Sequence, residues 1–153
     1  MVKEMVDEPE ESRADIKQRR IAAPVVEVFN AFRDEESLAR WWGPAGFTNT
    51  FYEFDFQTGG RWRHTMHGPD GTDYENESRF LAVIDNEKIV IEHLSGHHFI
   101  LTLTFENLDE TTIVHWQQLF DIREHYEKIR EFVSPANDQN LDKYVEEVKR
   151  RKK

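Results

Sequence analysis

Histidine is the residue type in this sequence that is best suited to chemistry, and its seven copies are spread along 153 residues. His64 and His67 lie three positions apart in a stretch that alternates like a strand, so their side chains should leave opposite faces. His97 and His98 are adjacent at an expected turn and should diverge as well. Zinc and iron sites need ligands that converge, and no H-E-x-x-H or similar spacing is present. The sequence therefore predicts no metal site, no cofactor and no catalytic set.

Two histidines, His64 and His93, each fall in a run of alternating apolar residues. Trp62, His64 and Met66 should share one face of a strand, and Ile91 and His93 should share one face of another. A buried imidazole is most often a core residue that bonds to a neighbouring hydroxyl or carbonyl group. The alternative is that both rings orient a ligand in an apolar pocket. General acid–base catalysis also stays open, and it would need a partner within hydrogen-bond reach.

The adjacent tryptophans Trp41 and Trp42 point to the same kind of site. They end a short helical segment that Gly43-Pro44 terminates. Each indole has roughly 150–250 Å² of surface to bury. Successive helical residues point about 100° apart, so both rings are not expected to enter one core. We therefore expect one ring in the core and the other beside a ligand cavity.

The elements that must position these residues follow from the apolar spacing. A strand is predicted from about residue 14 to residue 23, and Pro24 ends it because proline cannot donate to a ladder. Apolar residues then recur at helical spacing over residues 25–32. Asp34 is a suitable cap for a second short helix that ends at Trp41. Two short helices are thus expected after the first strand.

Residues 47–122 change to short alternating runs. Six β-rich runs separated by five tight turns are typical of an antiparallel meander. Tyr52, Phe54 and Phe56 alternate with polar residues, so all three are expected in the core of the sheet. The first strand and the meander together predict a curved seven-stranded sheet with one apolar face.

The tail returns to helical spacing. A first stripe over residues 126–133 should be interrupted by Ser134-Pro135, and a stronger stripe follows over residues 141–148. This long C-terminal helix is large enough to cover the apolar face of the sheet. The predicted class is therefore α+β.

Charge and composition limit the partners of the chain. The formal net charge is −10 with a pI near 5.2, which argues against nucleic acid or an anionic membrane surface. No apolar run approaches the roughly 18 residues of a spanning helix, so no membrane insertion is expected. The absence of cysteine excludes disulfides, and we expect a cytoplasmic protein. Residues 1–13 are interpreted as a mobile acidic leader and residues 14–153 as one domain.

Several short motifs, taken in order, are similar to those of a known family. They are Ala22-Ala23-Pro24, Val28-Phe29, Leu38-Ala39-Arg40-Trp41-Trp42-Gly43-Pro44, Phe54-Asp55-Phe56, Gly59-Gly60-Arg61-Trp62-Arg63, His67-Gly68-Pro69-Asp70-Gly71 and Asn140-Leu141-Asp142. Together they resemble the START-like or helix-grip (SRPBCC) superfamily, and within it the bacterial branch named after the activator of the heat-shock-protein-90 ATPase. The resemblance covers about residues 14–150. It implies a helix-grip fold, in which a curved sheet holds the C-terminal helix, and a hydrophobic cavity.

The resemblance implies a small-molecule or lipid-like pocket rather than co-chaperone work. Many relatives carry a Gly-Trp pair early in the last helix, whereas residues 136–140 here are Ala-Asn-Asp-Gln-Asn, which makes this helix face more polar. We therefore expect a protein that binds a small apolar or amphipathic molecule between sheet and helix. The predicted lining residues are Trp41, Trp42, Trp62, His64, Met66, Phe80, Ile91, His93 and Leu141. Two alternatives stay open: an enzyme of the polyketide cyclase or aromatase type, and a protein-interaction or stress-response module such as a homodimer.

Overall fold

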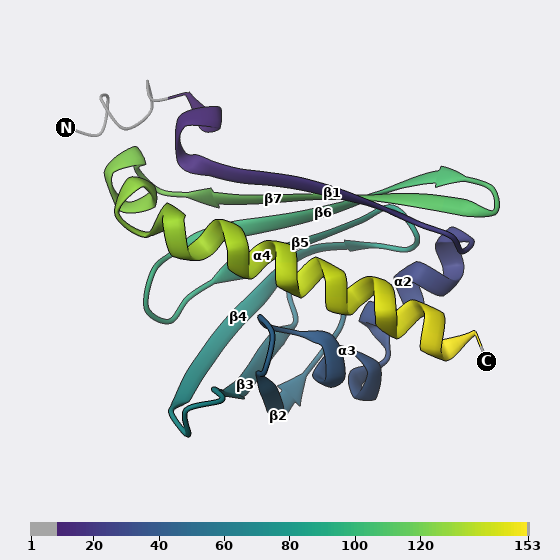
Figure 1. Cartoon of the computed structure of the whole chain (residues 1–153), viewed down its shortest axis with the longest axis horizontal. Coiled ribbons are helices and arrows are strands. Elements are labelled where there is room, and N and C mark those ends of the chain that lie inside the picture. Colours follow the sequence, from purple (N-terminus) through teal and green to yellow (C-terminus); the bar gives the residue numbers. More distant parts are fainter. Residues whose placement is uncertain (1–8, 153) are drawn as a thin grey trace.

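Seven strands form one antiparallel sheet, in the order β1-β7-β6-β5-β4-β3-β2, within residues 9–152, the part of the chain that this computed structural model describes (Figure 1). The strands are β1 (Ala14–Ile21), β2 (Thr48–Phe54), β3 (Arg61–His67), β4 (Asp73–Ile84), β5 (Lys88–His93), β6 (Phe99–Leu108) and β7 (Thr111–Phe120). The helices are the 3-10 turn η1 (Glu10–Arg13), α2 (Val25–Arg33), α3 (Glu35–Trp41) and α4 (Arg123–Arg151). The predicted α+β helix-grip architecture is confirmed. The leader predicted over residues 1–13 lies outside the described residues as far as position 8, and its end forms η1.

The long helix α4 crosses one face of the curved sheet, which we call the concave face, and α2 and α3 lie beside the C-terminal half of α4 (Figure 1). Leu141, Tyr144 and Val148 recur at helical spacing and are buried in this half of α4. The hydroxyl of Tyr144 donates to the carbonyl of Val28 at 2.6 Å, which fixes α2 to α4. As the sequence predicts, Asp34 caps α3 by accepting a hydrogen bond from the backbone of Glu36.

Alternation along the strands decides which side chains face α4. In β7, every second residue from Thr112 to Phe120 is buried. The register of the sheet places Trp62 opposite Ser78, and Ser78 opposite His93. Because directly paired residues point to the same side, the expected inward residues of β3 and β5 share the concave face.

The expectation that Tyr52, Phe54 and Phe56 all enter the core is wrong for Tyr52. A register shift between Phe51 and Glu53 places an extra residue in β2. This bulge turns Phe51 and Phe54 toward the core, whereas the Tyr52 side chain is 57% exposed. The hydroxyl of Tyr52 pairs with that of Thr65 at 2.8 Å on the outer face.

The predicted interruption at Ser134-Pro135 is also wrong, because α4 runs through both residues. A proline inside a helix removes one backbone hydrogen bond and crowds the carbonyl four residues earlier, here that of Glu131. Both Glu131 and Pro135 are exposed, so water is able to solvate the carbonyl that loses its partner. The buried residues of α4 begin only at Asn137, which leaves the first half of the helix projecting past the core.

Candidate functional site

The two adjacent tryptophans lie on the same side of α3, against expectation. The helix ends at Trp41, and Trp42 has the extended backbone angles φ −68° and ψ 134°. The 100° spacing of helical neighbours therefore does not apply, and the ring centroids lie 5.6 Å apart. Trp41 is buried and stacks on Tyr144 at 4.0 Å, as expected of a core residue. Trp42 is half-buried and faces the sheet, where it contacts Trp62 at 4.9 Å.

His64 lies between aromatic rings on the concave face. Its imidazole stacks on Trp62 at 4.6 Å and contacts Phe51 at 5.4 Å. Burial lowers the pKa of His64 from 6.5 to about 3, and the nearby His93 contributes a smaller effect in the same direction. The ring is therefore neutral near pH 7, with one donor and one acceptor nitrogen. Neither nitrogen has a hydrogen-bond partner among the described residues, so the common case of a satisfied core histidine does not apply.

His93 is the contrasting case, since both of its nitrogens have partners. Nδ1 lies 2.7 Å from the carbonyl oxygen of His97, which only accepts, so Nδ1 carries a proton. Nε2 lies 2.8 Å from the side chain of Asn76, which is also the strand partner of His64. Burial lowers the pKa of His93, although the bond to His97 opposes this effect. His93 also stacks on Phe99 at 4.5 Å, so it fits the role of a bonded wall residue.

The remaining predicted residues contribute apolar surface around this pair. Phe80 lies parallel to Trp62 at 5.9 Å and is fully buried. Ile91 is paired with Phe80 in the sheet, and Leu141 is buried on α4. Met66 is half-buried at the end of β3, where its terminal methyl group lies close to Gly43. The predicted residues thus gather where the sheet meets α3 and α4.

Four buried polar side chains of β3, β7 and α4 have atoms without a hydrogen-bond partner in the described part of the chain. The atoms are Nε1 of Trp62, both ring nitrogens of His64, Nε1 of Trp116 and Oδ1 of Asn140. Their residues are only 1%, 2%, 2% and 6% exposed, in that order. Leaving such an atom unpaired costs about 1–3 kcal/mol, and native proteins do so rarely. We call these four residues the unpaired cluster.

Sequence reasoning found two members of the unpaired cluster and missed Trp116 and Asn140. Trp116 falls on the buried phase of a strictly alternating strand, and this signal was present in the sequence. Asn140 lies in the polar stretch over residues 136–140, and only the structure shows that Asn137 and Asn140 are its buried members. Trp42 connects the tryptophans, since its ring also contacts that of Trp116 at 5.9 Å.

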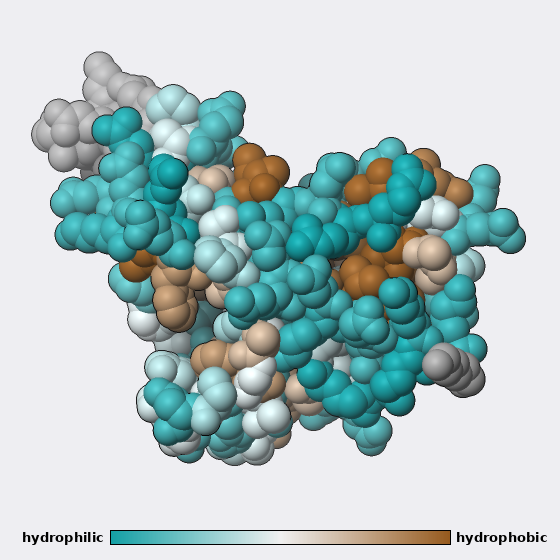
Figure 2. Space-filling model, in the orientation of Figure 1, coloured by the Kyte–Doolittle hydropathy of each residue, from teal (hydrophilic) through white to brown (hydrophobic). Residues whose placement is uncertain are grey.

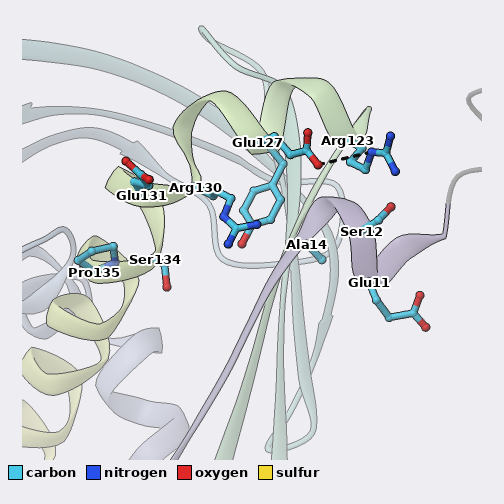
Figure 3. A pocket seen from close by; sticks show the side chains of 10 residues that line it. Glu11, Ser12, Ala14, Arg123, Glu127, Arg130, Glu131, Ser134 and Pro135 are labelled. Carbon is cyan, nitrogen blue, oxygen red and sulfur yellow. Dashed lines mark ion pairs between the residues drawn. The ribbon is translucent and has the colours of Figure 1, made fainter.

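A surface hollow lies elsewhere, away from the concave face. It has a volume of about 660 Å³ and separates η1 from the first turns of α4 (Figure 3). It is lined by Glu11, Ser12, Ala14, Arg123, Tyr126, Glu127, Arg130, Glu131, Ser134 and Pro135. An ion pair between Arg123 and Glu127 lies at its edge, and its lining includes none of the predicted cavity residues. A second hollow of about 310 Å³, lined in part by Arg40 and Trp41, lies between α3 and α4.

Two further properties bear on the kind of site. Among residues 9–152, no group of three or more His, Cys, Asp or Glu is placed to hold a metal ion. No helix in the same part of the chain is both long and apolar enough to cross a bilayer.

The sequence profile of one protein family, described as Activator of Hsp90 ATPase homolog 1-like protein, matches residues 22–148. This chain belongs to that family. The family lies within the START-like, helix-grip superfamily, as the motifs and the fold both indicate. No curated protein matches the sequence of this family member.

Solved structures agree with the assignment to the Activator of Hsp90 ATPase homolog 1-like family. A protein from Nitrosomonas europaea superposes with a TM-score of 0.85 at 16% identity, covering 94% of this chain and 99% of that one. A protein from Arthrobacter aurescens gives a TM-score of 0.84 at 21% identity, covering 94% and 90%. A protein from Silicibacter pomeroyi that carries the family name gives 0.71 at 17% identity, covering 88% and 96%. At these identities the likeness establishes the fold.

Proposed function

We propose that this protein binds a small apolar or amphipathic molecule on the concave face of the sheet, beneath α4. Trp42, Trp62, Met66, Phe80 and Ile91 supply apolar wall, with Trp41 and Leu141 behind them. His64 supplies polar contacts, and His93, whose two nitrogens are bonded within the protein, completes the wall. The unpaired cluster is the observation that carries this proposal. Its atoms lack partners inside the protein, and a bound molecule with polar groups would provide them.

The ligand would enter at the end of the concave face where several inward-facing side chains are only half-buried. Trp42, Met66, His93 and Phe99 keep part of their surface exposed although they face inward. Figure 2 shows the molecular surface hollowed below the projecting first half of α4. Ligand pockets commonly combine such an apolar lining with a few well-placed polar groups. A molecule that enters between the strand ends and α4 would reach the unpaired cluster last.

The two histidines support binding more than catalysis. A general acid or base needs a partner that orients it or accepts its proton. His64 has no such partner within residues 9–152, and its pKa of about 3 removes it from proton transfer near pH 7. Both nitrogens of His93 are already engaged. The polar groups are therefore suited to orienting a ligand.

The test is the substitution His64→Leu, with a library of lipids and aromatic metabolites screened by tryptophan fluorescence and native mass spectrometry. Leucine removes two unpaired nitrogens from an apolar setting, so the free protein should become more stable by about 1–3 kcal/mol. Ligand binding should weaken at the same time, because a polar contact is lost. A residue kept only for packing would not couple higher stability to weaker binding.

His67→Leu is the matched control, three residues along the same strand. His67 lies on the outer face and is bonded to Thr50 and Asp73 at 2.7 Å each. Its replacement should leave ligand binding unchanged. The proposal fails if no library member binds the wild-type protein, or if His64→Leu binds every ligand as well as wild type does.

We also propose that the protein acts in the cytoplasm. None of its 153 residues is a cysteine, whereas small exported domains commonly depend on disulfides. Fractionation of cells that carry the tagged protein tests the location, and recovery of the protein outside the cytoplasmic fraction would contradict it.

A further inference from the structure

The unpaired cluster has a composition that selects among ligands of the concave face. The indole Nε1 of a tryptophan only donates hydrogen bonds. Trp62 and Trp116 therefore offer two donors from opposite parts of the sheet, and each donor lacks an acceptor. The ring of Trp42 contacts both indoles, at 4.9 Å and 5.9 Å. An acceptor oxygen on a molecule that contacts these three tryptophans would be suited to accept a hydrogen bond from one or both indole donors.

The four side chains of the unpaired cluster carry no charge near pH 7. His64 is neutral near pH 7, and the side-chain oxygen of Asn140 is an uncharged acceptor. The ammonium group of Lys143 on α4 donates to the carbonyl oxygens of Pro44 and Phe47, at 3.2 Å and 3.3 Å, in the loop between α3 and β2. A buried carboxylate or ammonium group without a partner of opposite charge is strongly disfavoured. Charged head groups are therefore poorly matched to these residues.

Two acidic groups of α4, Glu147 and Asp138, are paired with arginines. Glu147 accepts hydrogen bonds from Arg40 and Arg150, at 2.9 Å and 2.8 Å. Asp138 is paired with Arg19 at 2.9 Å. Neither carboxylate remains free to hold a cationic ligand on the concave face.

We propose that the ligand is an uncharged molecule with an apolar body and a ketone, ester or hydroxyl oxygen that accepts hydrogen bonds from the indoles of Trp62 and Trp116. His64 and Asn140 are then available to a hydroxyl or amide hydrogen of the same molecule. This inference rests on the proposed function, since it assigns the chemical class of the ligand at that site.

The experiment uses three probes of equal chain length: 2-nonanone, nonanoate and nonylammonium. Each is titrated into the full protein, whose four tryptophans are labelled with ¹⁵N so that their indole N–H signals are followed by NMR. The ketone should move the signals of Trp62 and Trp116. The signal of Trp41 should stay in place, because its indole already donates to the carbonyl of Ala31 at 2.9 Å. Nonanoate and nonylammonium should bind about tenfold more weakly or not at all.

Trp62→Phe provides the variant test, because it keeps an aromatic ring and removes the indole donor. Affinity for 2-nonanone should fall about fivefold. Tyr52→Phe is the matched control: it removes a hydroxyl from an exposed ring on the outer face and should leave the affinity for the ketone unchanged. The wild-type NMR titration decides the question even if Trp62→Phe folds poorly.

The outcomes separate this inference from the proposed function. Nonanoate or nonylammonium binding as tightly as the ketone overturns the uncharged class and leaves ligand binding intact. A library ligand that binds without moving the Trp62 and Trp116 signals also overturns this inference, and it also leaves ligand binding intact. If neither the probes nor the library bind, both proposals fail.

Discussion

The rings of Trp41 and Tyr144 stack face to face, with centroids 4.0 Å apart and planes inclined by 7°. The contact joins the end of α3 to the C-terminal half of α4. Each ring also fixes α2, since Trp41 donates to the carbonyl of Ala31 and Tyr144 to that of Val28. This pair therefore holds the two short helices against the helix that covers the sheet.

Tyr144→Phe should keep the stacked ring and remove the hydrogen bond to Val28. Because the hydroxyl is fully buried, we expect a loss of about 0.5–1.5 kcal/mol in the free energy of unfolding, measured with urea. Tyr74→Phe is the control, since the Tyr74 side chain is 46% exposed, and it should change stability by less than about 0.5 kcal/mol. Equal effects of the two substitutions would show that the hydroxyl of Tyr144 has no special role.

Glu147 should contribute stability that acid removes. Burial raises the pKa of this carboxyl, but hydrogen bonds from Arg150, Arg40 and Ser37 outweigh it and hold the pKa at about 2, below the ordinary 4.5. A depressed pKa stabilises the folded state above pH 4.5, and this contribution disappears as the pH falls toward 2. Glu147→Gln should therefore cost about 1–3 kcal/mol at pH 7 and little near pH 2.

The neighbouring Glu146 supplies the control for this prediction. Its side chain is 73% exposed and pairs with Lys149 at 3.4 Å. Glu146→Gln should change stability by less than about 0.5 kcal/mol at either pH. Urea unfolding of wild type and both variants at pH 7 and pH 3 makes the comparison. A constant difference between wild type and Glu147→Gln across this range would contradict the assignment.

His98 should contribute stability that is lost as the pH rises, whereas the contribution of Glu147 is lost as the pH falls. Its imidazole lies 2.9 Å from Glu92 and 2.6 Å from Asp121. The bond to Glu92 raises the pKa of His98 above 6.5, against the opposing effect of burial, and Asp121 adds to the rise. A raised pKa gives stability that is complete below pH 6.5 and is lost as the pH rises through the pKa of the folded state.

His98→Gln should therefore lower stability at pH 5.5 and have less effect at pH 8.5. The difference should stay below about 1 kcal/mol, because the ring is partly exposed. His125→Gln on the exposed start of α4 is the control. Thermal unfolding at both pH values is the measurement, and a larger loss at pH 8.5 than at pH 5.5 would refute the prediction.

Pro135→Ala tests whether α4 is continuous. Alanine restores the missing backbone donor and removes the clash with the carbonyl of Glu131, so it should raise stability by about 1–3 kcal/mol. Circular dichroism during thermal unfolding measures both helicity and stability. If the helix breaks at Ser134-Pro135 in solution, as the sequence alone predicts, the substitution should leave stability unchanged.

Much of the fold could be predicted because local patterns act in the same direction as the tertiary structure. The turns between the strands and the stripe over residues 141–148 are both local signals, and both elements are confirmed. Tyr52 and Pro135 show where local patterns fail. A single bulge reverses the side of every residue after it, and a proline is tolerated where its neighbours remain in water.

The candidate site was only partly accessible to sequence reasoning. Alternation placed His64 and His93 on the concave face correctly. It did not show that His93 is bonded and His64 is not, because the partners Asn76 and His97 come from β4 and from the loop after β5. The convergence of Trp42 with Trp116 depends on where α3 ends and on strand order, and neither is a local property.

A crystal structure of the protein with its tightest library ligand tests the central claim most directly. The account predicts electron density for the ligand on the concave face, with an oxygen at about 3 Å from Nε1 of Trp62 or Trp116. Density in the hollow between η1 and α4 instead, with the unpaired cluster bonded only to water, would contradict it.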